Sequence, residues 1–273
     1  MKKYSRNQRV SAITKILIEN PNKIINLNYF TSKFNAAKST ISEDIVIVKD
    51  TFSSFSMGKV ETVSGAAGGV KYICGIDKKD IKDFAEELCL LINKKDRIIP
   101  GDFLYLTDVM CDPIIISKAG RILAAQFSNL DIDYVVTVET KGIPLAYEVA
   151  RMLGVELIIV RRQSMVTEGS TVSINYVSGS TKALQTMTLS KKSMKAKSKS
   201  IFIDDFMKAG GTAIGIVNLL KEFDSELLGI GVLIDNIEMK KKLVSDYISV
   251  VEFNGFNENR EAILQTSRFV NEI

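Results

Sequence analysis

The 273-residue sequence contains no histidine, and this absence excludes several kinds of site. A Ser-His-Asp or Cys-His mechanism needs an imidazole as its base, and a histidine-ligated metal centre needs one as a ligand. Any chemistry would therefore depend on carboxylates, lysines, backbone amides or a metal that arrives with a ligand. We accordingly expect no resident metal site.

Cysteine is scarce as well. Cys74, Cys89 and Cys111 are odd in number and lack the spacing of metal ligands, so we expect buried free thiols in a reducing cytoplasm. No apolar run approaches the length that crosses a bilayer, and no small-residue cleavage site follows an apolar core near the basic N-terminus. These absences predict a cytoplasmic protein without a signal peptide or a membrane partner.

The net charge of +4 is unevenly distributed along the chain. Residues 1–74 hold 11 Lys and Arg against 5 Asp and Glu, a net of +6, whereas residues 75–273 hold 25 against 27, a net of −2. The basic excess therefore lies wholly in the first quarter. It indicates either a polyanionic partner for that segment or merely a soluble basic face, and charge alone does not separate the two.

Helical periodicity dominates the first 55 residues. Three helices are expected, over residues 6–19, 26–34 and 38–55. The spacing from Thr40 to Glu43 fits a capping box at the start of the third helix, with Ser39 as another cap. That helix also carries an apolar stripe, which consists of Ile41, Ile45, Val48, Phe52 and Phe55.

After Gly58 the period changes, and KVETVSGAAGGVKYI is typical of two short strands around a glycine-rich turn. Three helices followed by a hairpin is the order of a winged helix-turn-helix, in which the start of the recognition helix enters the major groove of DNA. A small helical domain that binds protein is the alternative, but the charge and the hairpin together favour DNA. The expected DNA contacts are Lys2, Lys3, Arg6, Arg9, Lys38, Ser39, Thr40, Ser42, Lys59 and Lys71.

The rest of the chain alternates between helix and strand patterns, after a helix over residues 77–95 that joins two domains or lies in a dimer interface. The expected helices cover residues 116–129, 143–154 and 212–223, and the expected strands cover residues 133–140, 155–162, 200–206 and 227–235. This alternation predicts a mostly parallel sheet with ligands beyond the carboxyl ends of its strands. We therefore expect an α/β protein with domains over residues 1–74 and 75–273.

The stretch SIFIDDFMKAGGT, from Ser200 to Thr212, carries the clearest chemical signal. Asp204 and Asp205 end an apolar strand, and a glycine turn then enters a helix, where backbone N–H groups and the helix dipole favour a phosphate. Two carboxylates suit the vicinal hydroxyls of a ribose, so a sugar 5-phosphate fits the pattern. The alternative is a plain strand-to-helix turn with incidental acids, although carboxylates at the end of a buried strand are costly without a partner.

IFIDDFMKAGGT resembles the phosphoribosyl pyrophosphate (PRPP) motif of type I phosphoribosyltransferases, except that Ala209 stands where most of those enzymes have threonine. VETKGIPLA resembles their pyrophosphate loop, with Glu139 where a small residue is usual. Together with KSTISED, GAAGGVKY and TEGSTVSINYVSGS, these stretches make the chain similar to the purine operon repressors of Gram-positive bacteria. The resemblance covers nearly the whole chain and fades after about residue 236.

The resemblance implies a homodimer that represses purine biosynthesis and salvage genes by binding double-stranded operator DNA. PRPP, with or without Mg²⁺, would be the inducing effector in a non-catalytic pocket, and guanosine tetraphosphate would compete for that pocket. An active purine phosphoribosyltransferase is the alternative, and a protein-binding scaffold explains the charge asymmetry poorly. The expected effector residues are Phe103, Tyr105, Thr140, Lys141, Gly142, Arg161, Arg162, Ser178, Gly179, Asp204, Asp205, Phe206, Lys208, Ala209, Gly210, Gly211 and Thr212.

Residues 167–181, TEGSTVSINYVSGST, correspond to a flexible loop that closes over the reaction in transferases. Their small hydroxylated side chains are equally compatible with an ordered hairpin that brings Ser178 and Gly179 near the effector. The sequence does not choose between these alternatives.

Overall fold

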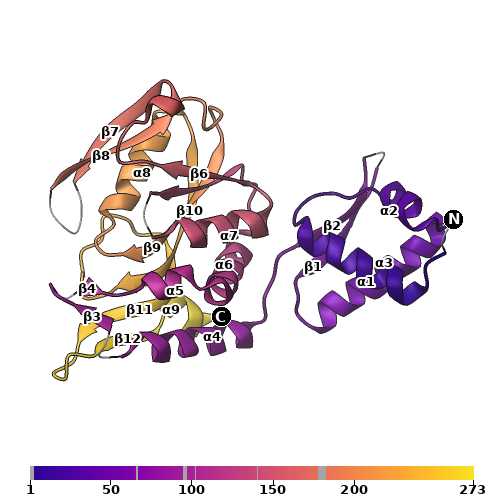
Figure 1. Ribbon diagram of the computed structural model, residues 1–273, viewed down its shortest axis with the longest axis horizontal. Coiled ribbons are helices and arrows are strands. Elements are labelled where there is room, and N and C mark those ends of the chain that lie inside the picture. Colours follow the sequence, from indigo (N-terminus) through magenta and orange to yellow (C-terminus); the bar gives the residue numbers. More distant parts are fainter. Residues whose placement is uncertain (1–2, 66, 95–96, 102, 140, 178–182) are drawn as a thin grey trace. The chain divides into compact units, whose positions relative to one another are not determined.

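A computed structural model of the chain divides into two compact units (Figure 1). The first comprises residues 1–77 with residues 151–154, and the second comprises residues 78–150 and 155–273. The structure describes residues 3–65, 67–94, 97–101, 103–139, 141–177 and 183–273. Within these residues no helix is long and apolar enough to cross a membrane. The domain boundary expected after residue 74 stays a prediction.

Three helices and a hairpin build the N-terminal unit, in the order that the sequence predicts for a winged helix-turn-helix. The elements are α1 (Arg6–Glu19), α2 (Leu27–Phe34), α3 (Lys38–Ser54), β1 (Lys59–Val63) and β2 (Gly69–Ile73). The two strands pair antiparallel, with Val60 opposite Tyr72. One apolar core joins all five elements through Ile13, Leu17, Phe30, Ile41, Ile45, Val48, Phe52, Val60 and Tyr72.

Two expectations for α3 are wrong. The helix begins at Lys38, after Ala37 as an N-cap without a side-chain bond, so Ser39 and Thr40 lie inside its first turn and form no capping box. The two residues between the C-cap of α2, Asn35 at φ +48°, and the start of α3 are Ala36 and Ala37, which offer no side-chain oxygen for a cap. Phe55 lies beyond the last turn and is 73% exposed, so it does not extend the buried stripe.

A six-stranded sheet forms the centre of the second unit, in the order β12-β11-β10-β9-β5-β6. The strands are β5 (Tyr134–Val138), β6 (Glu156–Val160), β9 (Lys199–Met207), β10 (Glu226–Asn236), β11 (Ile248–Phe256) and β12 (Ala262–Thr266). All described neighbours in this sheet are parallel except β12, which runs antiparallel to β11. The mostly parallel sheet that the sequence predicts is confirmed, and the carboxyl ends of its parallel strands meet at one edge.

Helices cover both faces of this sheet. Ile230 and Val232 of β10 belong to the core that includes α8 (Gly211–Lys221), whereas Gly231 approaches Phe127 of α6 (Pro113–Phe127). Because successive strand residues point to opposite faces, α8 and α6 lie on opposite sides of β10. A third helix, α7 (Ile143–Leu153), connects β5 to β6.

Residues 167–181 fall partly within an ordered hairpin, one of the two alternatives that the sequence leaves open. Its strands β7 (Thr171–Val177) and β8 (Leu184–Ser190) pair antiparallel, and β7 packs against α8. Tyr176 and Met187 of this hairpin are buried in the same core as α8. The hairpin therefore packs against α8, the helix that follows the glycine turn over residues 207–211.

Several elements of the second unit are not expected from the sequence: β3 (Ile98–Ile99), β4 (Phe103–Leu104), α5 (Thr107–Cys111), β11, β12 and α9 (Arg268–Glu272). The helix expected over residues 77–95 is present as α4 (Lys78–Ile92), and it packs against β12, β11 and α9. α6 begins at Pro113 rather than residue 116, because the Asp112 carboxylate accepts bonds from the amides of Ile114 and Ile115.

The three thiols are all free, as expected, but they are not all buried. Cys74 and Cys89 are buried, and burial raises the pKa of the Cys89 thiol to about 11. Cys111 is exposed at the end of the short α5, so the expectation of a buried thiol is wrong there.

Candidate functional site

A cavity of about 320 Å³ opens where β9 and β10 end. It gathers ten of the expected effector residues: Phe103, Lys141, Asp204, Asp205, Phe206, Lys208, Ala209, Gly210, Gly211 and Thr212. Met207, the first residue of the expected phosphate-binding turn, also lines it, as do residues that the sequence does not single out, among them Leu104, Leu106, Phe202, Asn236 and Phe253. The acid pair, the glycine turn and one lysine of the loop after β5 therefore surround a single space.

The turn from β9 into α8 is shaped by glycine. Gly210 is the N-cap of α8 at φ +82°, a backbone conformation that glycine adopts without steric cost. No side chain bonds the start of α8 at this cap, so the first N–H groups of the helix are not satisfied by an N-cap side chain. Backbone donors and the positive end of the helix dipole thus meet at the cavity wall, which favours an anion such as a phosphate.

Asp204 and Asp205 form an acid pair in which burial and proximity change the pKa of one carboxyl group. Asp204 is buried and Asp205 is half-buried, and the Asp204 Oδ1 atom accepts the backbone N–H of Asp205 at 3.0 Å. Burial and the neighbouring Asp205 raise the pKa of Asp204 well above its ordinary value, although the charge of Arg162 lowers it in part. A carboxyl group with a raised pKa can donate a hydrogen bond as well as accept one, which suits sugar hydroxyls.

The loop after β5 lies directly against this pair. A side-chain carbon placed on Gly142 would come within 2.8 Å of the Asp204 Oδ1 atom and 3.1 Å of the Asp205 backbone nitrogen, so a larger residue would displace the Asp204 carboxyl group. Lys141 lines the cavity, while Thr140 lies outside the described residues.

The remaining effector candidates are not gathered at the cavity wall. Arg161 is bound by two carboxylates, with its Nη1 atom 2.8 Å from Glu139 and its Nε atom bonded to Glu168, and these contacts raise its pKa. Arg162 and Tyr105 are exposed and outside the lining, although the charge of Arg162 acts on Asp204. Ser178 and Gly179 lie outside the described residues.

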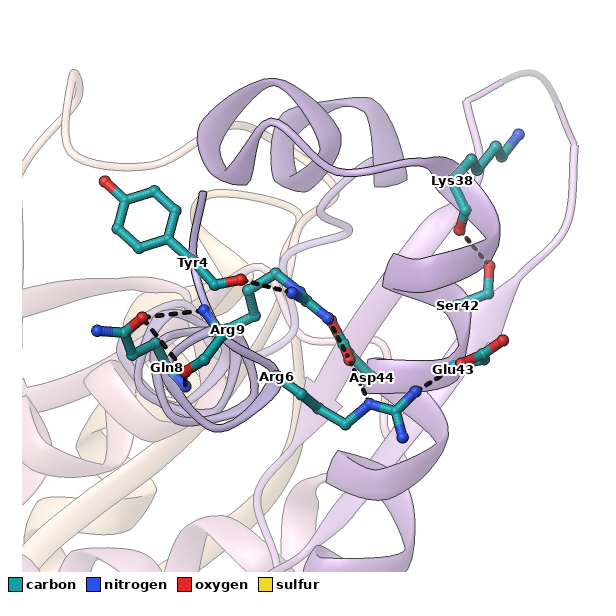
Figure 2. Close-up of polar contacts among 9 residues, drawn as sticks. Tyr4, Arg6, Gln8, Arg9, Lys38, Ser42, Glu43 and Asp44 are labelled. Carbon is teal, nitrogen blue, oxygen red and sulfur yellow. Dashed lines mark hydrogen bonds and ion pairs between the residues drawn. The ribbon is translucent and has the colours of Figure 1, made fainter. Parts of the chain in front are cut away.

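Among the expected DNA contacts of the N-terminal unit, Arg9 has a structural role (Figure 2). Its guanidinium donates to both oxygens of Asp44, at 2.6 and 3.2 Å, and to the carbonyl oxygen of Tyr4 at 2.7 Å. Both charged side chains are buried between α1 and α3. We therefore correct the expectation that Arg9 contacts phosphate, because its donors point into the unit.

Arg6 lies on the surface beside the same pair, with its Nη2 atom 2.8 Å from Glu43 of α3 (Figure 2). Lys38 and Ser42 are exposed along the first turns of α3, and the Ser42 hydroxyl donates to the Lys38 carbonyl at 2.9 Å. In Figure 2 the Lys38 ammonium points away from the Arg6–Glu43 pair. The exposed start of α3 thus has two basic side chains near it, Lys38 at its first residue and Arg6 beside Glu43.

The other expected DNA contacts are distributed over the unit. Lys3 and Ser39 are exposed, and Thr40 is half-buried. On the hairpin, the Lys59 ammonium pairs with Glu61 at 2.5 Å, while Lys71 is half-buried. Lys2 lies outside the described residues.

A winged-helix unit followed by a parallel sheet with this turn defines a regulator built on the phosphoribosyltransferase fold. Residues 5–74 match the family described as "Bacterial purine repressor, N-terminal", and residues 112–267 match the "Phosphoribosyl transferase domain". The purine biosynthesis transcriptional repressor PurR of Bacillus subtilis (strain 168) is 45% identical over 269 residues, which cover 98% of this chain and 94% of that protein. The chain belongs to the bacterial purine repressor family.

Other relatives support the same assignment. The purine biosynthesis transcriptional activator PurR of Lactococcus lactis subsp. lactis is 37% identical over 98% of this chain and 99% of its own length. The adenine phosphoribosyltransferase of Rhodothermus marinus covers 62% of this chain and 99% of its own, with 20% identity and a TM-score of 0.54, which shows the fold alone. The prediction of a regulator rather than an enzyme is confirmed, because relatives that cover nearly the whole chain are regulators.

Proposed function

We propose that the protein is a repressor of purine biosynthesis and salvage genes that PRPP releases from double-stranded operator DNA. The observation that carries this proposal is the cavity in which the Asp204–Thr212 turn meets Lys141, in a chain that begins with a winged-helix unit. In this proposal the protein acts as a homodimer, because a two-fold protein reads two half-sites of an operator.

In this proposal each part of PRPP contacts a different group of residues in the cavity. Asp204 and Asp205 face the ribose hydroxyls, the glycine turn holds the 5-phosphate, and Lys141 supports the pyrophosphate. The two carboxylates supply the hard oxygen atoms that Mg²⁺ prefers, so an ion that arrives with the pyrophosphate fits beside them. Guanosine tetraphosphate offers the same phosphate chemistry and is the competing ligand of this proposal.

Release of DNA follows from linkage between two binding equilibria. If PRPP binds better to the state with low DNA affinity, operator DNA must weaken PRPP binding by the same factor. The pocket needs no catalytic group for this role, since only binding energy shifts the equilibrium.

A mobility-shift assay tests the proposal with the DNA upstream of the gene that encodes this chain. We expect a shifted complex at low salt that dissociates as PRPP is added, and no pyrophosphate release when adenine, guanine, hypoxanthine or xanthine is supplied with PRPP. Stronger DNA binding with PRPP would contradict release of the DNA by this effector. Pyrophosphate release at roughly 1–10³ s⁻¹ would indicate a phosphoribosyltransferase.

Lys38 offers a specific test of the DNA-binding surface. Replacing it with alanine is expected to weaken operator binding and to reduce the slope of log affinity against log salt by about one unit, because one phosphate contact is lost. The slope is measured by fluorescence anisotropy between low and moderate salt. Lys15→Ala is the matched control, since Lys15 lies on α1 and pairs with Glu19 at 2.6 Å, and an unchanged slope for Lys38→Ala would exclude a phosphate contact there.

A further inference from the structure

The segment over residues 237–247, between β10 and β11, contacts the turn over residues 207–209, which precedes α8. From this segment Lys242 places its Nζ atom 2.6 Å from the carbonyl oxygen of Lys208 and 3.4 Å from that of Met207. The same ammonium lies 2.7 Å from the carbonyl oxygen of Asn236 and 2.6 Å from the Asp235 Oδ1 atom. Only 14% of the Lys242 side chain is exposed, so this is an interior contact.

The next residue continues the same pattern. The backbone N–H of Leu243 donates to the carbonyl oxygen of Ala209 at 2.9 Å. The carbonyl oxygens of three consecutive residues, Met207, Lys208 and Ala209, are therefore bound by two adjacent residues of one segment.

Peptide geometry gives this arrangement a direct consequence for the cavity. None of the described peptide bonds is cis, and in a trans peptide the C=O group and the following N–H group point in opposite directions. Carbonyls held toward Lys242 and Leu243 therefore turn the N–H groups of residues 208–210 to the other side. Residues 208–210 all line the cavity, and successive N–H groups that point to one side form an anion-binding nest.

Charge reinforces this orientation. An ammonium bound to peptide carbonyls polarises those peptides and strengthens the N–H groups at their other ends as donors. Asp235 balances the ammonium, and the Tyr247 hydroxyl holds the second Asp235 oxygen at 2.9 Å. Burial and Asp235 raise the pKa of Tyr247, so its hydroxyl remains a donor at ordinary pH.

We propose that Lys242 is a positioning residue for effector binding, which presets the backbone donors of residues 208–210 for the phosphate of a ribose 5-phosphate group. The inference rests on the proposed function for the identity of that phosphate. It also explains how the turn manages with Ala209, where most phosphoribosyltransferases supply a threonine hydroxyl. With alanine at this position the backbone N–H groups take a larger share of the binding, and Lys242 and Leu243 fix their direction.

Calorimetric titration of the full-length protein tests the proposal with three ligands: PRPP, ribose 5-phosphate and inorganic pyrophosphate. We expect Lys242→Met to lose at least tenfold in affinity for PRPP and for ribose 5-phosphate. Its affinity for pyrophosphate should stay within about twofold of the wild type, because Lys141 lies on a different loop. The exposed neighbour provides the matched control, Lys241→Met, which should leave all three affinities unchanged.

The conservative variant Lys242→Arg keeps a cation at the carbonyls and should retain most of the ribose 5-phosphate affinity. Wild-type affinity of Lys242→Met for ribose 5-phosphate, or an equal loss for pyrophosphate, would overturn the proposal. If Lys242→Met does not fold, Tyr247→Phe carries the test, with a smaller loss in the same direction for ribose 5-phosphate alone. Failure of the wild type to bind PRPP or ribose 5-phosphate would instead refute the proposed function.

Discussion

Replacing Asp44 with alanine is expected to lower the free energy of unfolding of the N-terminal unit by about 3–5 kcal/mol. The reason is that Arg9 would remain buried between α1 and α3 without the carboxylate that accepts its two hydrogen bonds. Hydrogen–deuterium exchange of α1 and α3, followed by mass spectrometry on the full chain, measures this loss locally. Operator binding should fall with it, because the same pair anchors α3, the expected recognition helix.

Two further variants separate this buried pair from its exposed neighbour. Arg6→Ala removes an exposed ion pair with Glu43 and a longer contact, 3.7 Å, between the Arg6 Nε atom and Asp44. Because the Arg6 side chain is exposed, the loss should be less than about 1 kcal/mol. The double variant Arg9→Met/Asp44→Leu removes both buried charges and should recover most of the lost stability. If Asp44→Ala and Arg6→Ala had equal effects on exchange, the buried pair would not hold the two helices together.

Asp204→Asn is expected to lower PRPP affinity on the order of a hundredfold, while operator binding without PRPP stays unchanged. The asparagine keeps the shape of the side chain but replaces one of the two carboxyl oxygens that face the ribose hydroxyls, and a buried hydrogen-bonding group that loses its partner costs about 1–3 kcal/mol. PRPP would then no longer release the DNA in a mobility-shift assay. Loss of ligand response and DNA binding together would contradict the division of labour between the two units.

The same variant is expected to be more stable than the wild type, by an amount that grows with pH. The pKa of Asp204 is higher in the folded protein than in an unfolded chain, because burial and Asp205 disfavour its charge. Its contribution to stability is therefore full below the ordinary carboxyl pKa of about 3.9 and is lost as the pH rises through the raised pKa. A melting temperature that rises by a few degrees near neutral pH, but not near pH 4, would identify this effect.

The periodicity of the sequence predicts α1 to β2 and the strands β5, β6, β9 and β10, because each carries a regular apolar face. The same reasoning does not find β11 (ISVVEFNGF) and β12 (AILQT), whose apolar runs are short and are interrupted by polar residues and a glycine. These two strands meet their partners only in the assembled sheet. The N-cap of α3 was also predicted wrongly. Residues 40–43 have the residue types of a capping box, but they lie inside the helix, whose N-cap is Ala37.

The residues of the candidate site also separate into those that the sequence predicts and those that it does not. Asp204 to Thr212 could be predicted because the acid pair, the turn and the helix start are contiguous in sequence. Lys242 could not, since a lysine in a polar stretch has no signal until β10 and β11 bring it behind the turn. Arg9 was misjudged in the opposite direction, because composition counts a buried arginine as part of a basic surface.

The contact between α4 and β12 determines which part of the chain can fold first during synthesis. Asn93, just after α4, accepts the N–H of Leu264 at 2.9 Å, 171 residues further along the chain, and α4 packs against β12. During translation the apolar face of α4 therefore remains exposed until the ribosome has synthesised β12. The apolar core of α1 to β2 consists of residues between Ile13 and Tyr72, so this part can fold on the nascent chain well before the sheet closes.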